Sequence, residues 1–464
     1  MATHYGKCRL ESEMRYLNND AISNEDRWLF DNTINLSLNG DADLKLINKR
    51  VSDKSYFKEI ALEGTSKERL ISSLSFNKTF GGLEMNAYSE AEQLVNSGQS
   101  NYTKAGEIRL AKQYSFNSFN IDLNNTSTNF HHKNTSNSEV LRNHQKISIS
   151  RNFKELEYEI IPTISLSNTN YQFNKLPNNK RFIYSSDIIA RLFLERELKI
   201  LNEDFIQTLV PILQYSYTPK KNQNLIPNFD TESVDNDTFD SFFAANSFLG
   251  SDKISNQNNI SLGIESEFIN DNSGDTILTL KAAQKFYLDD QVMNSSGYFV
   301  KTRDSKRGYS DINASLEFNL PFFTLAQSIN FNPDDMRSGN TRSSMEFRGS
   351  GRNNLELSYL DHNSNQSARL TSVFDINETD HFFLRADRDL TADITNNVTF
   401  GLARENCCIA FRFAFFKKHR YSDKYSYKRA YELVFKGLTT TTPSLRERIE
   451  AEIPDYIGDL DNNL

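Results

Sequence analysis

The stretch INLSLNGDADLKL, residues 34–46, decides the fold class. Apolar residues occupy every second position from 34 to 38 and again from 42 to 46, on either side of Asn39-Gly40. An Asn-Gly pair between two runs of period two is the strongest short-range signal for a β-hairpin. The stretch therefore predicts two antiparallel strands joined by a tight turn.

The same unit recurs along the chain. Alternating runs flank polar turns at residues 270–274 and 362–366, and further alternating runs cover 398–402, 411–415 and 431–435. Each strand with its turn takes about 20 residues, so we expect about 20 strands. Helical periodicity is weak, which predicts an all-β chain.

Two segments resist this pattern. Residues 188–201 mix apolar residues with charged ones such as Arg191 and could form an amphipathic helix, but their neighbours all alternate, so we expect a strand there. Residues 444–453, after Pro443, predict a short helix or ordered tail with Ser444 as a candidate N-cap.

Composition excludes several classes. The 464 residues include 53 basic and 61 acidic groups, a formal net charge of −8 that disfavours broad nucleic-acid binding. A hydrophobic content of 38% and a charged content of 25% fit neither a helical membrane protein nor a disordered acidic chain. The three cysteines are too few for a disulfide-framed small domain. The chain has no apolar run long enough for a transmembrane helix and no apolar signal-peptide core at its start.

Two classes of protein lack both a transmembrane helix and a signal peptide. One is a soluble cytoplasmic β protein, and the other is a membrane β-barrel whose beginning has been cut away. Soluble sandwiches place strands at a spacing of about 8–12 residues with Gly- and Pro-rich turns, whereas this chain has only 18 Gly and 9 Pro and turns rich in Asn, Ser and Asp. A β-solenoid would show a fixed repeat period, and none is found. We therefore predict a large antiparallel transmembrane β-barrel of the outer-membrane type.

The sequence offers little chemistry. None of the common nucleophile, zinc, phosphate-loop or dinucleotide motifs occurs, so we expect no enzyme, no cofactor and no metal. His131 and His132 are adjacent, and adjacent side chains on a strand point to opposite faces, which argues against a shared metal. An acidic cluster could hold a hard cation but lacks the EF-hand order, so we expect a solvated loop at Asp230, Asp235, Asp237 and Asp240.

Cys407 and Cys408 sit side by side within an expected strand region. Neighbours on a strand face opposite sides, and a bond between them would be a strained vicinal disulfide. In an oxidising compartment each could instead bond to a different distant cysteine. The pair could equally be two small apolar residues with no such role.

Three sets of short segments resemble the LptD family of lipopolysaccharide-assembly proteins of the Gram-negative outer membrane. They keep the family's order and spacing over nearly the whole chain. The first stretch comprises 27–30 and 51–57, the second 194–197, 207–211, 214–219, 228–230, 242–243, 248–254 and 258–263, and the third 405–408, 435–438 and 453–456.

The resemblance implies a barrel of about 26 strands, near the top of the known range. It implies that lipopolysaccharide arrives from a periplasmic LptA-like bridge through an N-terminal β-jellyroll domain. The lipid would then enter the outer leaflet through a lateral opening between the first and last strands, with an LptE-like lipoprotein filling the lumen. The family's adjacent cysteines form two disulfides with the N-terminal domain, and Cys407 and Cys408 match that pair.

The chain departs from the family pattern at its start, where the jellyroll, its cysteines and the signal peptide are not found. We therefore expect an N-terminally truncated sequence, with residues 1–438 as an incomplete barrel and 439–464 as a C-terminal tail containing a short helix. Cys8 matches neither N-terminal partner, so its role is not assigned.

The function expected from the resemblance is that of a lipopolysaccharide translocon component in the cell outer membrane, in contact with outer-membrane lipid. The alternatives are a general porin and a soluble β-rich adhesin. We place the last strand, one wall of the opening, within residues 400–438 and Cys407 and Cys408 close to the seam. Lumen-facing cations such as Arg412 could attract lipid phosphates, although an ordinary polar lumen residue is the simpler expectation.

Overall fold

The computed structural model describes residues 7–20, 24–38, 41–59, 69–95, 101–134, 139–200, 202–233, 238–290, 308–334, 338–362, 364–406, 408–419, 424–435, 445–453 and 456. Within these ranges nearly all regular structure is β-strand. None of the helices found there is long and apolar enough to cross a membrane.

One sheet of 24 strands dominates the fold. Successive long strands pair antiparallel in chain order. The short strands β9 and β12 pair with β10 and β13, respectively. The strands are β1 (Cys8–Leu17), β2 (Arg27–Leu38), β3 (Ala42–Val51), β4 (Arg69–Phe80), β5 (Leu83–Leu94), β6 (Thr103–Phe116), β7 (Phe119–His131), β8 (Val140–Arg151), β9 (Phe153–Lys154), β10 (Tyr158–Phe173), β11 (Asn179–Leu192), β12 (Leu194–Ile200), β13 (Glu203–Thr218), β16 (Gln257–Asn270), β17 (Thr276–Tyr287), β18 (Ile312–Leu320), β19 (Phe323–Phe331), β20 (Ser338–Arg348), β21 (Asn354–His362), β22 (Asn365–Asp375), β23 (Asp380–Asp389), β24 (Ile394–Glu405), β25 (Ile409–His419) and β26 (Tyr425–Phe435).

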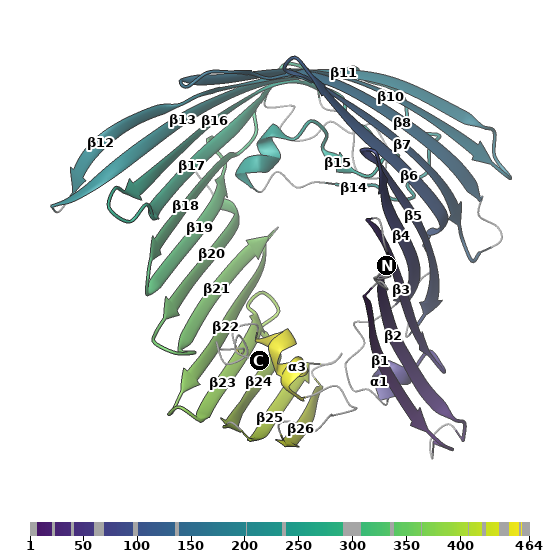
Figure 1. The fold of residues 1–464 in the computed structure, drawn as a ribbon, viewed down its shortest axis with the longest axis vertical. Helices are drawn as coiled ribbons and strands as arrows, with labels where there is room; N and C mark the ends of the chain where they lie inside the picture. The colour runs from purple at the N-terminus through teal and green to yellow at the C-terminus, as the bar shows by residue number, and fades with distance from the viewer. Residues whose placement is uncertain are drawn as a thin grey trace, which may run out of the picture.

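The sheet curves into a tall arch with β10 and β11 at its top and β1 and β26 at its two lower ends (Figure 1). In the described part of the chain β1 pairs only with β2, and β26 only with β25. The two end strands therefore each present an unpaired backbone edge. Such an edge is costly in hydrocarbon unless another strand covers it.

Side chains alternate between an apolar outer face and a polar inner face. On β10, Ile164 is 59% exposed while the next residue, Ser165, is 7% exposed. The register continues this alternation across the sheet, with Ile164 opposite Ile149 of β8 and Ser165 opposite Ser148. Exposed apolar and buried polar side chains invert the pattern of a soluble protein and are typical of a barrel wall in a membrane. The predicted fold class is confirmed.

The hairpins predicted from the sequence are also confirmed. Leu38 lies opposite Ala42, so β2 and β3 form the hairpin expected around residues 39 and 40, which themselves lie outside the described residues. Residues 188–200 of the segment 188–201 are extended, as expected, and form the end of β11 and all of β12, whereas residue 201 lies outside the described residues. The sheet has more strands than the about 20 expected, because several connections need only two residues, as at Gly81-Gly82 between Phe80 and Leu83.

The two ends of the strands differ in their connections. At one end, the turn end, hairpins such as 81–82, 117–118 and 321–322 take two residues. At the other, the loop end, connections such as 219–256 and 288–311 are much longer. Bacterial outer-membrane barrels keep short turns in the periplasm and long loops outside, so the turn end is the periplasmic end.

Three segments lie inside the arch (Figure 1). The segment 219–256, called the inner loop below, contains a small two-stranded sheet of β14 (Glu232–Ser233) and β15 (Phe248–Leu249) and the 3-10 helix η1 (Phe239–Phe243). Helix α3 (Leu445–Glu452) lies near β24–β26, and the single turn α1 (Tyr56–Glu59) follows β3. The apolar clusters form where these segments pack against the wall.

Candidate functional site

Each of the three family-like stretches contributes to a separate buried cluster, in which an arginine binds carboxylates. In the first stretch, Arg27 is almost fully buried and binds Asp53 through two hydrogen bonds, of 2.9 and 2.8 Å. It also donates to Asp20 at 3.0 Å and to Ser55 at 3.1 Å. The guanidinium therefore ties the connection before β2 to the one after β3, at the loop end of the wall. Bidentate pairs of this kind are among the stronger protein hydrogen bonds.

The second stretch supplies the ion pairs that fix the inner loop to the wall. Arg142 of β8 is 1% exposed and donates to both carboxylate oxygens of Asp230, at 2.7 and 2.6 Å. It also donates to Asp252 at 2.8 Å. The second oxygen of Asp252 accepts the backbone N–H groups of Phe229 and Asp230. Arg142 thus holds two points of the folded loop that are 22 positions apart, Asp230 and Asp252.

A second wall cation binds the carbonyls of the same loop. Arg181 of β11 donates to the backbone oxygens of Ser251 and Asp252 and, at 2.7 Å, to the Gln223 amide oxygen. Lys253 of the loop is 1% exposed and donates to the carbonyls of Gln223 and Ile226. These bonds satisfy backbone groups that the loop would otherwise bury without partners.

Two glycines permit this close packing. Gly250 has φ +79°, and a β-carbon there would lie 2.3 Å from the Asp230 carbonyl oxygen. On β16, a β-carbon at Gly263 would lie 2.5 Å from the ring of Phe243. The absence of a side chain at these positions lets the loop fold on itself and lets η1 pack on the inner face of the wall.

Loop docking is expected to weaken at low pH. Burial alone would raise the pKa of Asp230, but hydrogen bonds and charge attraction from Arg142 outweigh it and lower the pKa from 3.8 to about 2. The folded state therefore favours ionised Asp230, whose contribution is complete above the ordinary value and is lost as the pH falls toward 2. Asp252 opposes this trend because burial raises its pKa.

Protease protection of the loop, compared between the wild type and Asp230→Asn across this pH range, measures the effect. The wild type should lose protection as the medium is acidified, and the variant should show a flatter profile at lower overall protection. Identical profiles would show that Asp230 does not control docking.

The third stretch builds a cluster beside the last strands. Arg412 of β25 is buried and donates to Glu405 of β24 and to Glu432 of β26, each at 2.7 Å. The Tyr456 hydroxyl donates to Glu405 Oε1, the oxygen that also accepts from Arg412, at 2.9 Å. Arg412 therefore joins β24, β25 and β26 through two ion pairs. Because both carboxylates neutralise its charge, Arg412 attracts lipid phosphate only weakly.

Helix α3 packs across the inner face of these strands, in the region where a short helix was expected. Ile449, Ile453 and Tyr456 form one apolar cluster with Phe383 and Phe416 of the wall. Glu452 at the helix end accepts from Lys418 at 2.9 Å and from Thr399, and its carbonyl accepts from Arg385 at 2.6 Å. Burial alone would raise the pKa of Glu452, but the hydrogen bonds from Thr399 and Lys418 lower it. The tail therefore links β23, β24 and β25 from inside.

Cys408 lies in the turn between β24 and β25 and not within a strand, which corrects the expectation for this position. Cys408 is exposed there, and its backbone N–H donates to the Asn406 side chain at 2.9 Å. Cys407 lies outside the described residues. Cys8 is exposed on β1.

The other sequence candidates are dispersed. His131 contacts Glu139 and His132 packs against Tyr102, so they do not share a ligand. Asp230 is an ion-pair partner and not part of a solvated loop, which corrects that expectation; its partner is 88 positions away and could not be seen locally. Asp240 is exposed on η1, whereas Asp235, Asp237 and Ser444 lie outside the described residues. Within the part of the chain that the structure describes, no three His, Cys, Asp or Glu side chains gather to hold a metal ion.

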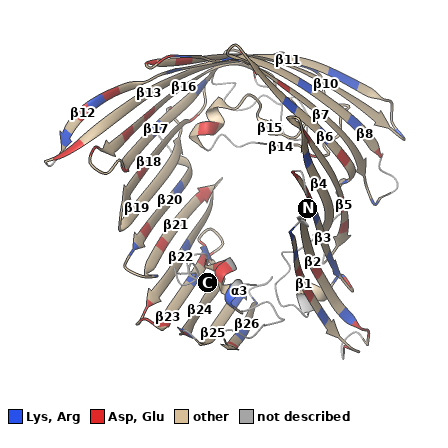
Figure 2. Ribbon diagram, in the orientation of Figure 1, with Lys and Arg blue, Asp and Glu red and all other residues tan. Residues whose placement is uncertain are grey.

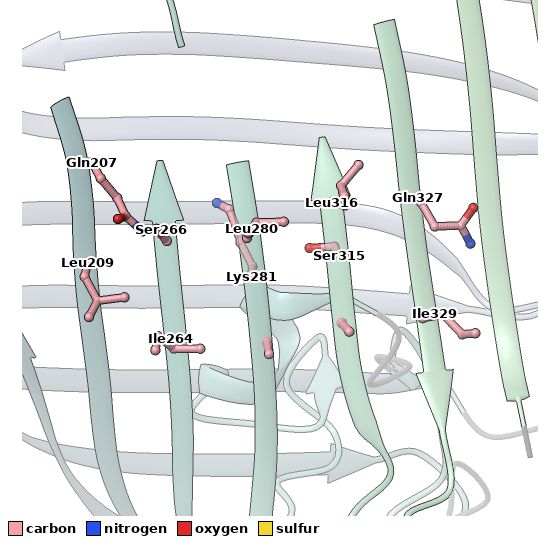
Figure 3. Close-up of a pocket in the computed structure, with 12 residues that line it drawn as sticks. Gln207, Leu209, Ile264, Ser266, Leu280, Lys281, Ser315, Leu316, Gln327 and Ile329 are labelled. Carbon is pink, nitrogen blue, oxygen red and sulfur yellow. Dashed lines mark hydrogen bonds between the residues drawn. The ribbon is translucent and has the colours of Figure 1, made fainter. Parts of the chain in front are cut away.

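A groove of about 460 Å³ crosses β13–β19 (Figure 3). Its lining includes Ile264, Leu280, Leu316 and Ile329, which the register places on the outer face. Small residues such as Ala282 leave the depression between them. The groove therefore belongs to the membrane-facing surface of the wall and not to its lumen.

Comparison with known proteins identifies the family. Residues 25–384 match the family described as LptD, LPS transport system D. The chain belongs to the LptD family. An LPS-assembly protein LptD from Idiomarina loihiensis is 23% identical over 424 residues, which cover 87% of this chain and 55% of the relative. Another from Coxiella burnetii is 28% identical over 237 residues, or 50% of this chain and 27% of the relative.

The chain thus spans about half, or less, of the length of these LptD relatives. Among solved structures, the siderophore receptor PirA from Acinetobacter baumannii matches 89% of this chain and 79% of its own, with 9% identity and a TM-score of 0.37. That likeness is too low to support an argument about this LptD family member.

Proposed function

We propose that this chain forms the barrel part of an outer-membrane component that inserts lipopolysaccharide into the outer leaflet through an opening beside β26. The observation that supports this most is the wall itself, with an apolar outside and a polar inside. A lipid with an anionic head and apolar tails needs a wet route for the head and a lateral exit for the tails. Within a continuous ladder that exit would break hydrogen bonds at several kcal/mol each.

The proposed partners follow from the family. Lipopolysaccharide is the substrate, an LptE-like lipoprotein occupies the lumen, and an LptA-like bridge delivers lipid from the periplasm. The inner loop already fills part of the space inside the arch, so a lumen partner would meet the loop as well as the wall (Figure 1). The proposed location is the cell outer membrane.

Depletion of the gene in its native context tests the function. Lipopolysaccharide at the cell surface should fall while it accumulates in the periplasm or the inner membrane. A general porin would instead leave surface lipopolysaccharide unchanged and lower only the flux of small solutes, which would overturn the proposal.

The cysteine pair gives a second test. We propose that Cys407 and Cys408 form disulfides with a periplasmic domain, because the β24–β25 turn lies at the turn end next to the last strands. Cys407→Ser combined with Cys408→Ser, made in the native gene, should abolish the oxidised form on non-reducing gels and reduce surface lipopolysaccharide. Cys8→Ser, which removes the exposed cysteine of β1, is the matched control and should change neither. Normal export by the double variant would contradict the role.

A further inference from the structure

Three cations share the outer face of neighbouring strands at the turn end. Lys78 of β4 lies opposite Met85, and Lys112 of β6 lies opposite Leu83. Arg151 of β8 lies opposite Phe119, at the tip of the β6–β7 hairpin. The same face carries the exposed apolar residues Leu74, Phe80, Ile108, Phe116, Ile147 and Ile149, with Phe116 72% exposed. These cations therefore point toward the membrane and not into the lumen.

Each of the three cations lies over an aromatic ring. The Lys78 ammonium is 4.8 Å from the centroid of Phe80, and the Lys112 ammonium is 4.9 Å from that of Tyr114. The Arg151 guanidinium lies 4.4 Å from the Phe153 ring and 5.0 Å from the Phe119 ring. Aromatic residues of outer-membrane barrels gather at the level of the lipid headgroups. The cations are thus fixed at that level, with one side against a ring.

None of the three forms an ion pair with any residue that the structure describes. Lys112 donates only to the Gly81 carbonyl at 3.3 Å. The acids on the paired strands, such as Glu84 and Asp122, alternate to the lumen face. Glu155 and Glu157, in the turn before β10, form no ion pair with Arg151. This sector is therefore cationic at its outer surface, without internal compensation.

Unpaired cations of this sector lie at one end of the strands. At the loop end of β5, β7 and β8, the outward residues Ala91, Asn129, Leu141 and Asn143 carry no charge, and His131 there contacts Glu139. Figure 2 shows charged residues along many strands, so the asymmetry concerns the outward positions of this sector and not the strands as a whole. The asymmetry indicates a ligand for the cations at the turn end, which is the end in the periplasmic leaflet.

We propose that this sector, Lys78, Lys112 and Arg151 with their rings, binds the anionic headgroups of phospholipids in the periplasmic leaflet. An interfacial lysine or arginine extends its charge to the headgroup level and there attracts anionic lipid. The ring beneath each cation orients it and leaves its other side open to a phosphate. The proposal needs the wall to lie in a membrane, and it holds whether or not the chain transports lipopolysaccharide.

The test uses the full chain in detergent micelles that contain labelled phosphatidylglycerol and phosphatidylcholine. After detergent exchange, the lipid retained by the protein is measured. The wild type should retain phosphatidylglycerol in preference to phosphatidylcholine. The triple variant Lys78→Gln, Lys112→Gln and Arg151→Gln should lose that preference by about a hundredfold, since each of the three cations near an anionic surface contributes about a fivefold increase in affinity.

A matched control removes three lumen-facing cations of β3, β6 and β8, through Lys45→Gln, Arg109→Gln and Lys146→Gln, and should leave the preference unchanged. The three single variants keep the test decisive if the triple variant does not fold, and each should lose part of the preference. An unchanged preference in the triple variant, an equal loss in the control, or better competition by lipid A or inorganic phosphate than by phosphatidylglycerol would overturn the proposal.

Discussion

Replacing Arg142 by methionine is expected to release the inner loop from the wall. The variant keeps a long side chain but removes the cation that contacts both Asp230 and Asp252. Two carboxylates then remain at a site where Arg142 and Asp252 are almost fully buried. Removing one partner of a buried pair costs about 3–5 kcal/mol, because the remaining charge stays desolvated without compensation.

Trypsin cleavage provides a direct measurement. Lys253 is 1% exposed in the docked loop, whereas Lys221 is exposed at its start. Cleavage after Lys253 should appear in Arg142→Met and be absent in the wild type, while cleavage after Lys221 should occur in both.

Arg109→Met is the matched control. Arg109 also lies on the lumen face, but with the residues that the structure describes it makes only a 3.4 Å hydrogen bond, to Asn124. It should leave Lys253 protected. Combining Arg142→Met with Asp230→Asn and Asp252→Asn should restore part of the protection, because no uncompensated charge remains. Full protection of Lys253 in Arg142→Met would show that the ion pairs do not hold the loop.

The wall could be predicted from the sequence because its information is local. The alternation within residues 34–46 fixes which side chains of β2 and β3 face outward, and the turn fixes the register, with Leu36 opposite Leu44. Strand period and turn chemistry act over a few residues, so each hairpin can be recognised alone. The repetition of the same unit then gives the architecture.

The interior could not be predicted in this way, because its contacts join distant parts of the chain. Arg142 and Asp252 are 110 positions apart, and Tyr456 and Glu405 are 51 apart. The polar character of the inner loop indicated solvent exposure, although its acids are paired with wall cations. The useful signal was the family-like segments, since 228–230 and 248–254 contain both acids that Arg142 binds and the glycine at position 250.

Replacing Arg412 by methionine is expected to loosen the last strands. Arg412 joins Glu405 of β24 to Glu432 of β26, so its loss leaves two carboxylates facing each other across β25. Glu405 also accepts from Tyr456, which helps hold the C-terminal segment in place. The expected cost is again about 3–5 kcal/mol, and it falls on the wall next to the proposed opening.

Hydrogen exchange measures this effect strand by strand. In Arg412→Met, the backbone amides of β26 and α3 should exchange faster, while those of β10 and β11, at the top of the arch, should not change. Tyr456→Phe removes one hydrogen bond to a charged group, worth about 1.5–3 kcal/mol, and should show the same pattern more weakly.

Arg429→Met provides the control on the same wall, because Arg429 is exposed on β26 and forms no ion pair with the residues that the structure describes. It should leave exchange in β26 and α3 as in the wild type. Adding Glu405→Gln and Glu432→Gln to Arg412→Met should slow the exchange again, because the neutral amides need no cation. If the opening lies beside β26, surface lipopolysaccharide should fall in Arg412→Met and not in Arg429→Met. Faster exchange with unchanged export would show that Arg412 stabilises this wall but that its stability does not affect lipid passage, which would contradict an opening beside β26.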